Sequence, residues 1–257
     1  EGRLGIFVAG GQQQDAEVLS SVEFYSADED ISPEAFKRIM TRLVGFIDKE
    51  RQAESICDKR CARFAEAALA YANEVSVGSY QPESVALLEE GLEFLDGSEM
   101  RSPLYAGLLG RLANARSLRD EPELRAARAR EAVSIARTTE DLAALAATLK
   151  DYHFCLMGVG SASMRRAIAD ELYDLAASLR SAPFEMWALK YRTESALEDG
   201  ATSELQTCCR IFDKQAHFHR MPFFLCHAFH HDAMLALREG RLEEVEALAG
   251  RGLELGM

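Results

Sequence analysis

The chain has few basic residues for its size. Its 257 residues include 29 lysines and arginines against 42 acidic residues, which gives a net charge of −13. A field of that sign repels nucleic-acid phosphates and anionic lipids. We therefore expect this segment to bind neither DNA nor a membrane surface directly. An acidic chain of this kind more often selects a peptide, a small molecule or a basic partner.

Long apolar runs are also missing. No stretch reaches the roughly 18 apolar residues that a membrane-spanning helix needs. The opening Glu1-Gly2-Arg3 lacks the residue order of a secretory signal. Because the first residue is not methionine, we expect a fragment of a longer protein, although a processed N-terminus would begin in the same way.

The cysteines form no framework of regular spacings. With 48% apolar residues, the chain has enough material for a core that needs no disulfides. We expect reduced, mostly buried thiols in a cytoplasmic protein. The six are Cys57, Cys61, Cys155, Cys208, Cys209 and Cys226. Cys57 and Cys61 are four residues apart, but a packed helix face is favoured there over a redox or metal pair.

Residues arranged for catalysis are likewise absent. The Gly10-Gly11 pair is not followed by the lysine and hydroxyl residue of a phosphate-binding loop. No Ser/His/Asp or Cys/His arrangement stands out, and the carboxylates are scattered. The chain is therefore predicted not to be an enzyme by itself, and no cofactor is expected.

Helical periodicity dominates from Ser32 onward. After the Ser32-Pro33 start, apolar residues recur at helical spacing from Phe36 to Ile47, and similar stripes follow to the end of the chain. We expect an irregular segment at 1–31, N-terminal helices at 32–80 and helical repeats at 81–257. The predicted helices are 34–50, 53–75, 83–95, 103–118, 122–137, 141–157, 162–180, 183–198, 201–217, 221–239 and 241–255.

The spacing of these helices indicates a repeat. Links of two to seven residues favour antiparallel neighbours, and helix pairs begin at 103, 141, 183 and 221. A helix pair recurring at about 40 residues predicts an all-α, TPR-like α-solenoid. A globular helical bundle without a true repeat is the alternative. The clearest pair is 233–248, where Gly240 is expected to form the turn and Leu242, Val245 and Leu248 to face the core.

Three segments carry a resemblance to a known group of proteins. They are 131–149, Leu197-Glu198-Asp199-Gly200 and 236–241. These segments resemble the C-terminal helical region of large bacterial signalling proteins, over about residues 83–257. The proteins are STAND-type ATPase regulators of the MalT/LuxR kind, AfsR/SARP-type activators and AAA-linked class III nucleotide cyclases.

The resemblance implies a sensing role. In those families this region senses an inducer or a regulatory protein and restrains an upstream ATPase. Neither the ATPase nor DNA binding is implied for this chain, because it has no Walker motif and no helix-turn-helix with a basic face. The chain also departs from the pattern in one stretch, where histidines replace ordinary aromatic and apolar residues. They are His217, His219, His227, His230 and His231.

That histidine stretch allows a metal site. His227 and His231 are four residues apart and would share one helix face, with Cys226 beside them and Cys208 and Cys209 on the preceding helix. Packing histidines near the bend at 221–222 are the favoured interpretation, because no Cys-x-x-Cys spacing occurs. A pH-responsive cluster is a further possibility.

Large residues gather on the predicted first helices, which line the concave face of a TPR stack. An aromatic-lined groove with one or two cations would hold a peptide or a small anionic ligand. The alternative is that such residues fill gaps between helices. The candidate ligand-binding residues are Tyr152, His153, Trp187, Tyr191, Arg192, Phe223 and His227, with His230 nearby.

Three functions follow from these observations. The leading hypothesis is a sensor or scaffold module of a bacterial signalling or transcription-regulatory protein, which binds a protein, peptide or small ligand and passes the change to a neighbouring effector domain. The second is a non-catalytic helical arm of a larger ATPase or nucleotide cyclase. The third is a metal-binding helical protein that uses the His217–His231 cluster.

Overall fold

The computed structural model describes residues 58–74, 80–95, 100–158 and 162–256, together with Thr41 and Gly45. These ranges are helical and contain no strand, so the all-α prediction is confirmed for the part of the chain they cover. The chain divides into two compact units, residues 1–160 and 161–257, and each is described by itself. No helix within these ranges is both long enough and apolar enough to cross a membrane.

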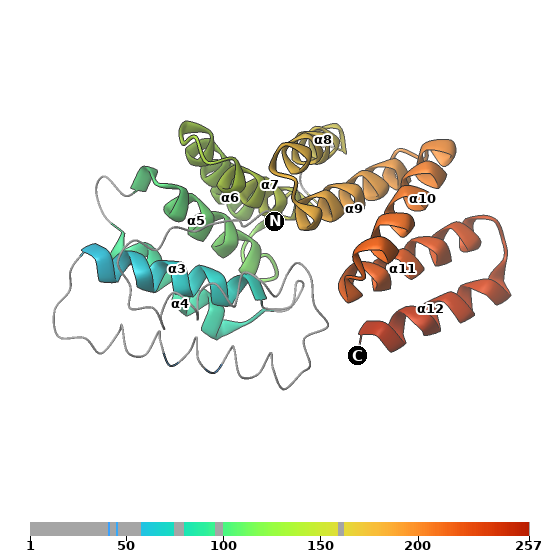
Figure 1. The fold of residues 1–257 in the computed structure, drawn as a ribbon, viewed down its shortest axis with the longest axis horizontal. Helices are drawn as coiled ribbons and strands as arrows, with labels where there is room; N and C mark the ends of the chain where they lie inside the picture. The colour runs from blue at the N-terminus through green and yellow to red at the C-terminus, as the bar shows by residue number, and fades with distance from the viewer. Residues whose placement is uncertain are drawn as a thin grey trace. The chain divides into compact units, whose positions relative to one another are not determined.

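The observed helices follow the predicted ones closely (Figure 1). In the first unit they are α3 (Asp58–Glu74), α4 (Pro82–Phe94), α5 (Pro103–Ala115), α6 (Pro122–Thr138) and α7 (Leu142–Cys155). In the second unit they are α8 (Ala162–Leu179), α9 (Ala182–Glu198), α10 (Thr202–His219), α11 (Pro222–Arg238) and α12 (Leu242–Gly256). The expected segment 1–31 lies outside the described residues, as does the expected helix 34–50 apart from Thr41 and Gly45, which are helical.

Local signals explain where the helices begin. The Ser102 hydroxyl accepts a hydrogen bond from the backbone N–H of Tyr105 at 3.1 Å, which caps α5. The Asp141 carboxylate accepts from two backbone N–H groups of α7, at 2.9 Å each. Proline fills the first turn of α4, α5, α6, α9 and α11, where its missing N–H removes no helical bond.

Glycines provide two of the turns in the second unit. Gly200 follows α9 with φ of 68°, and Gly240 follows α11 with φ of 75°. Both values lie in the left-handed region, which a side chain makes unfavourable and glycine adopts freely. The predicted turn at Gly240 is therefore observed.

Helix α5 is the centre of the first unit. It contacts α3, α4, α6 and α7, and α3 also packs on α4 and α6 on α7. Small residues allow the close approach: a Cβ on Gly110 would lie 3.4 Å from the Ala132 Cβ of α6 and 3.5 Å from the Thr148 Cγ2 of α7. Leu88, Leu108 and Leu112 form the apolar core around this helix.

A buried polar network crosses the same unit. The Arg111 guanidinium in α5 donates to the Ala72 carbonyl near the end of α3 at 2.9 Å, and it lies 3.5 Å from the Asp151 carboxylate in α7. The Asn114 side-chain amide donates to Asp151 at 2.8 Å. The Arg111 and Asp151 side chains are each only 5% exposed. The network therefore joins α3, α5 and α7 through groups that have little access to water.

The second unit packs each helix on the next one along the chain. Contacts join α8 to α9, α9 to α10, α10 to α11 and α11 to α12. Met186 and Leu189 of α9 meet Phe212 of α10 and Phe224 of α11 in one core cluster. Helices α9 and α11 therefore come together through their side chains.

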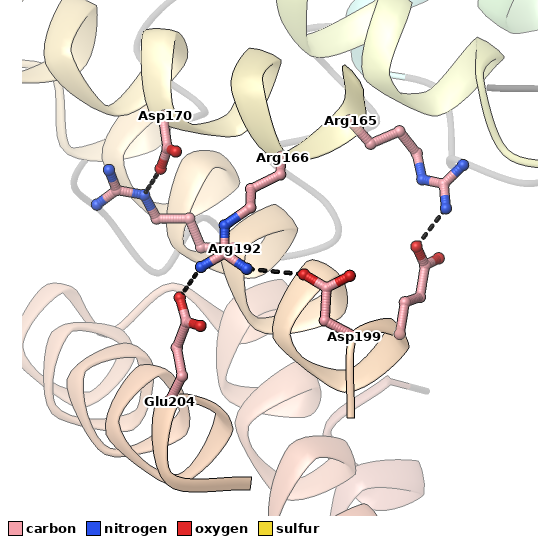
Figure 2. A network of polar contacts seen from close by, with 7 residues as sticks. Arg165, Arg166, Asp170, Arg192, Asp199 and Glu204 are labelled. Atoms are coloured by element: carbon pink, nitrogen blue, oxygen red, sulfur yellow. Dashed lines mark hydrogen bonds and ion pairs between the residues drawn. The ribbon is translucent and has the colours of Figure 1, made fainter. Parts of the chain in front are cut away.

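Ion pairs hold α8, α9 and α10 at the surface of this unit (Figure 2). Arg165 pairs with Glu198, and Arg166 pairs with both Glu204 and Asp199, the latter at 2.8 Å. Arg192 of α9 reaches back to Asp170 of α8 at 2.7 Å. Because these groups are partly exposed, each pair contributes modestly to stability, and together they orient the three helices.

One core assignment is wrong. Leu242 was predicted to face the core, but its side chain is 65% exposed. Helix α12 instead packs on α11 through a face that includes Gly252, where an added Cβ would lie 3.5 Å from the Phe229 Cβ. Val245 and Leu248 are half-buried, in partial agreement with the prediction. Leu242 is ten residues before Gly252, which places it about 80° away around the helix axis. Its side chain therefore points away from the contact with α11.

The buried network generates the first testable prediction. Replacing Asp151 with Ala leaves the Arg111 guanidinium buried without its carboxylate, so we expect the free energy of unfolding to fall by about 3 kcal/mol. Urea unfolding followed by circular dichroism measures this change. The control Glu131→Ala, at an exposed position of α6, is expected to change stability by less than about 0.5 kcal/mol. Equal losses in the two variants would show that the network does not stabilise the unit.

Candidate functional site

A continuous series of ring contacts joins α9 to α11. The Trp187 ring of α9 lies 5.3 Å from the Phe223 ring of α11, measured between ring centroids. Phe223 lies 4.6 Å from His227, one helical turn further along α11, in an edge-on arrangement. His227 in turn lies 6.4 Å from His230. Four rings from two helices therefore follow one another without interruption.

Much of this series is open to solvent. Phe223 is 44% exposed, His230 is exposed, and Trp187 and His227 are half-buried. An aromatic ring at that exposure leaves apolar area in contact with water, and burying it against a partner is favourable. Exposed aromatic residues held by a packed core are typical of binding surfaces.

Lys190 places a cation beside these rings. Its Nζ lies 5.7 Å from the Trp187 ring centroid and 5.5 Å from that of Tyr191. Both distances are within the range of a cation–π interaction. The ammonium also pairs with the Glu194 carboxylate at 2.5 Å, and the Lys190 side chain is only 12% exposed. We call Trp187, Lys190, Phe223, His227 and His230 the aromatic–histidine surface.

Two histidines of α11 are held neutral by their surroundings. Burial lowers the pKa of His227 to about 4, with smaller contributions from the nearby Lys190 and His230. Burial also lowers the pKa of His231 to about 3, with contributions from His227, Lys190 and His230. Removing an imidazole from water disfavours its charged form, so both rings carry no charge at neutral pH.

His231 is a buried neighbour of the aromatic–histidine surface. It is 3% exposed, its ring lies 4.7 Å from that of Phe212 in α10, and its Nδ1 is buried with no hydrogen-bond partner. His227 and His231 are four residues apart, as the prediction of a shared face required, and their ring centroids lie 6.3 Å apart. The pair therefore connects the exposed rings to the core.

Not all of the predicted ligand-binding residues belong to this surface. Tyr191 is 2% exposed, so it packs beneath Trp187 and does not face solvent. Arg192, the next residue, turns to α8, where it pairs with Asp170 and covers the Tyr173 ring at 4.0 Å. A change of one position along a helix rotates the side chain by about 100°, which explains the difference.

Tyr152 and His153 lie in the first unit. They are 7% and 1% exposed, so their side chains are part of the interior of that unit. The Tyr152 hydroxyl accepts a hydrogen bond from Arg130 at 3.3 Å. For these two residues the structure matches the alternative interpretation, in which large side chains fill the space between helices.

Lys190 is the member of the aromatic–histidine surface that sequence reasoning missed. It follows Trp187 by three positions, so helical periodicity places both on one face of α9. The spacing alone could have identified it, together with Glu194 one turn later.

The histidine and cysteine side chains do not converge on one point. Among the described residues, no group of three or more histidine, cysteine or acidic side chains has the geometry of a metal site. Cys226 and His227 are consecutive in α11 and point about 100° apart. Burial raises the pKa of Cys209 to about 12 and also raises that of Cys208, so both thiols stay protonated. Cys61 is buried, and Cys57 lies outside the described residues.

No protein-family model matches the chain, and no curated protein matches it.

The buried histidines predict how the stability of the second unit depends on pH. In the unfolded chain both imidazoles bind a proton near pH 6.5, whereas the folded chain takes these protons up only near pH 4 and pH 3. The unfolded state binds more protons over this window, so stability is greatest above pH 6.5 and falls as the pH is lowered. For His231 alone the loss from pH 6.5 to pH 5 is on the order of 1 to 2 kcal/mol.

Urea unfolding followed by the fluorescence of Trp187, the one tryptophan of the chain, measures this effect in the second unit. His231→Leu is expected to reduce the acid-induced loss by an amount on the order of 1 to 2 kcal/mol. His217→Gln is the control, because His217 is exposed on α10 and hydrogen-bonds within its own helix. The same pH dependence in both variants would contradict the assignment.

Proposed function

We propose that this chain is a helical-repeat binding module, which acts as a sensor or scaffold within a signalling or transcription-regulatory protein. It binds a segment of a partner protein on the aromatic–histidine surface. The binding changes the state of a neighbouring effector domain. The chain itself performs no chemistry in this proposal.

The packing of the first unit supports the repeat architecture. Helix α4 contacts both α3 and α5, and α6 contacts both α5 and α7. In addition, α3 contacts α5 and α5 contacts α7. This is the pattern of a TPR-like stack, in which each second helix lies against two successive first helices and the first helices lie side by side.

Helix contacts and ring contacts in the second unit support the same architecture. Helix α10 contacts α9 and α11, as a second helix between two first helices would. The alternate helices α9 and α11 meet through the rings of Trp187, Phe223 and Phe224. First helices line the inner face of a TPR-like stack, and that face is where such stacks bind extended ligands.

The observation that carries the proposal is the exposure of an aromatic series on two neighbouring helices. Phe223 is 44% exposed although it lies within 5.3 Å of Trp187 and 4.6 Å of His227, so the rings form one contiguous, partly exposed surface. Trp187 and Phe223 rest on the buried Phe224, whose ring centroid lies 5.5 Å and 5.1 Å from theirs. A pre-ordered surface of this kind loses little side-chain entropy on binding, which favours recognition.

The chain offers a matched pair of phenylalanines that tests this assignment. Phe223 belongs to the aromatic–histidine surface, whereas Phe218, on α10, is 76% exposed and meets the His219 ring edge-on at 4.9 Å. Phe223→Ala is expected to weaken partner binding by about tenfold or more, because truncating a central aromatic residue of a binding surface removes about 2 kcal/mol. Phe218→Ala is expected to have little effect.

Quantitative affinity capture from a lysate of the source organism, with the purified wild-type chain and the two variants, measures this difference. The proposal predicts proteins that are retained by the wild type and by Phe218→Ala and are lost with Phe223→Ala. Identical sets of retained proteins for all three baits would contradict the proposed surface. Circular dichroism of each variant checks that the fold is kept.

A further inference from the structure

Building on the proposed function, we infer that the occupant of the aromatic–histidine surface is an acidic segment of a partner protein, in which an aspartate or glutamate stands next to an aromatic or aliphatic residue. The carboxylate lies beside Lys190, His227 and His230, and the apolar side chain packs on Phe223 and Trp187.

The first step concerns the cation. An ammonium group has three hydrogen-bond donors, and Glu194 takes one of them at 2.5 Å. Lys190 is held in place by that pair and by the Trp187 and Tyr191 rings, and its side chain is 12% exposed. A cation fixed at the edge of an apolar surface interacts with a carboxylate more strongly than a mobile, fully solvated one does.

The second step concerns the imidazoles. The groups whose charge acts on His227 are basic, namely Lys190 and His230. Lys190 is a local cation in a chain whose net charge is −13, and Glu194 compensates part of its charge. A carboxylate beside His227 comes near the Lys190 ammonium, a group with three hydrogen-bond donors of which Glu194 takes one. Each neutral imidazole also offers one N–H donor to a carboxylate.

The third step concerns the apolar part. Phe223 is 44% exposed and Trp187 is half-buried, and both lie next to the cationic region, because Phe223 is 4.6 Å from His227 and Lys190 is 5.7 Å from Trp187. A ligand that satisfies both parts carries a charged and an apolar group a few ångströms apart. The surface is open and extends over two helices, which fits a protein segment better than a small ligand, since small ligands are mostly enclosed by their sites.

A consequence of this arrangement is that binding takes up a proton. A carboxylate placed beside His227 favours the charged imidazole, so the pKa of His227, about 4 in the free protein, rises on binding. The acidic segment then binds more tightly as the pH is lowered from 7.5 to 5.5. The gain approaches about tenfold if the pKa returns to its ordinary value of about 6.5. A peptide glutamate, with a pKa of about 4.3, stays ionised over this range.

A random-peptide library displayed on phage, panned against the immobilised chain, tests the inference and does not require an identified partner. Peptides that bind the wild type but not Phe223→Ala are expected to be enriched in Asp or Glu within two positions of an aromatic or aliphatic residue. Enrichment of basic or uncharged peptides would overturn the inference and leave the proposed binding surface standing. If no peptides depend on Phe223, both the inference and the proposed function fail.

Synthesised peptides from that selection then test the individual contacts by isothermal titration calorimetry. Lys190→Met keeps the side chain over the rings and removes its charge, so it is expected to weaken the acidic peptide about tenfold. The control Lys214→Met alters an exposed lysine of α10 and is expected to change nothing. The peptide with Gln in place of Glu is expected to bind Lys190→Met and the wild type equally. Equal binding of the acidic peptide to Lys190→Met and the wild type would contradict the role of Lys190.

The pH arm compares the acidic peptide at pH 7.5 and pH 5.5, with Trp187 fluorescence confirming that the second unit stays folded. Tighter binding at pH 5.5, absent for the Gln peptide and absent in His227→Gln, agrees with proton uptake at His227. Binding of the acidic peptide that is unchanged or weaker at pH 5.5 would contradict the placement of its carboxylate beside this ring.

Discussion

Each helix that the structure describes depends on its neighbours for burial of its apolar face. The helices described are 13 to 18 residues long, and isolated helices of that length are marginal in water. Each one is therefore stabilised by packing on helices that are close in sequence, as α5 does with α4 and α6. The same constraint brings alternate helices together: α5 reaches α7 in the first unit, and α9 reaches α11 in the second. What the chain places between alternate helices then decides what each unit can do.

The two units differ in the residues that lie between their alternate helices. In the first, Arg111, Asn114 and Asp151 form a network with little exposure, which joins three helices. Such a network is costly to break, so it favours one arrangement of the helices. In the second, the rings of Trp187 and Phe223 meet between α9 and α11, and Phe223 remains 44% exposed. A contact of this kind holds the helices together and still leaves an apolar surface for a partner. In the proposed function, the first unit is therefore a framework and the second unit binds the partner.

Sequence patterns predicted the helices better than they predicted the site, and the reason is physical. Helix ends are set by local chemistry: Ser102 and Asp141 cap the residues next to them, and Gly200 adopts a conformation that other residues avoid. Exposure is set by neighbours that are distant in sequence. Tyr191 is one turn from Trp187 and is nevertheless buried. Arg192 pairs with Asp170, which lies 22 positions earlier in the chain. Leu242 is exposed because α12 packs through another face. Trp187, Phe223 and His227 were foreseen as candidates, but only the arrangement of α9 and α11 brings them into one surface.

Hydrogen–deuterium exchange of the chain with and without a selected acidic peptide tests the central claim most directly. The backbone of every described helix can be monitored in one experiment, including helices far from the proposed surface. If the aromatic–histidine surface is the binding site, the peptide will slow exchange in 187–194 of α9 and 223–231 of α11. The backbone amides of helices α3 to α7, and those of the α12 turns that do not contact α11, will exchange at the same rate as in the free protein. Protection centred on the first unit or on α12, with no change in α9 and α11, would contradict the account.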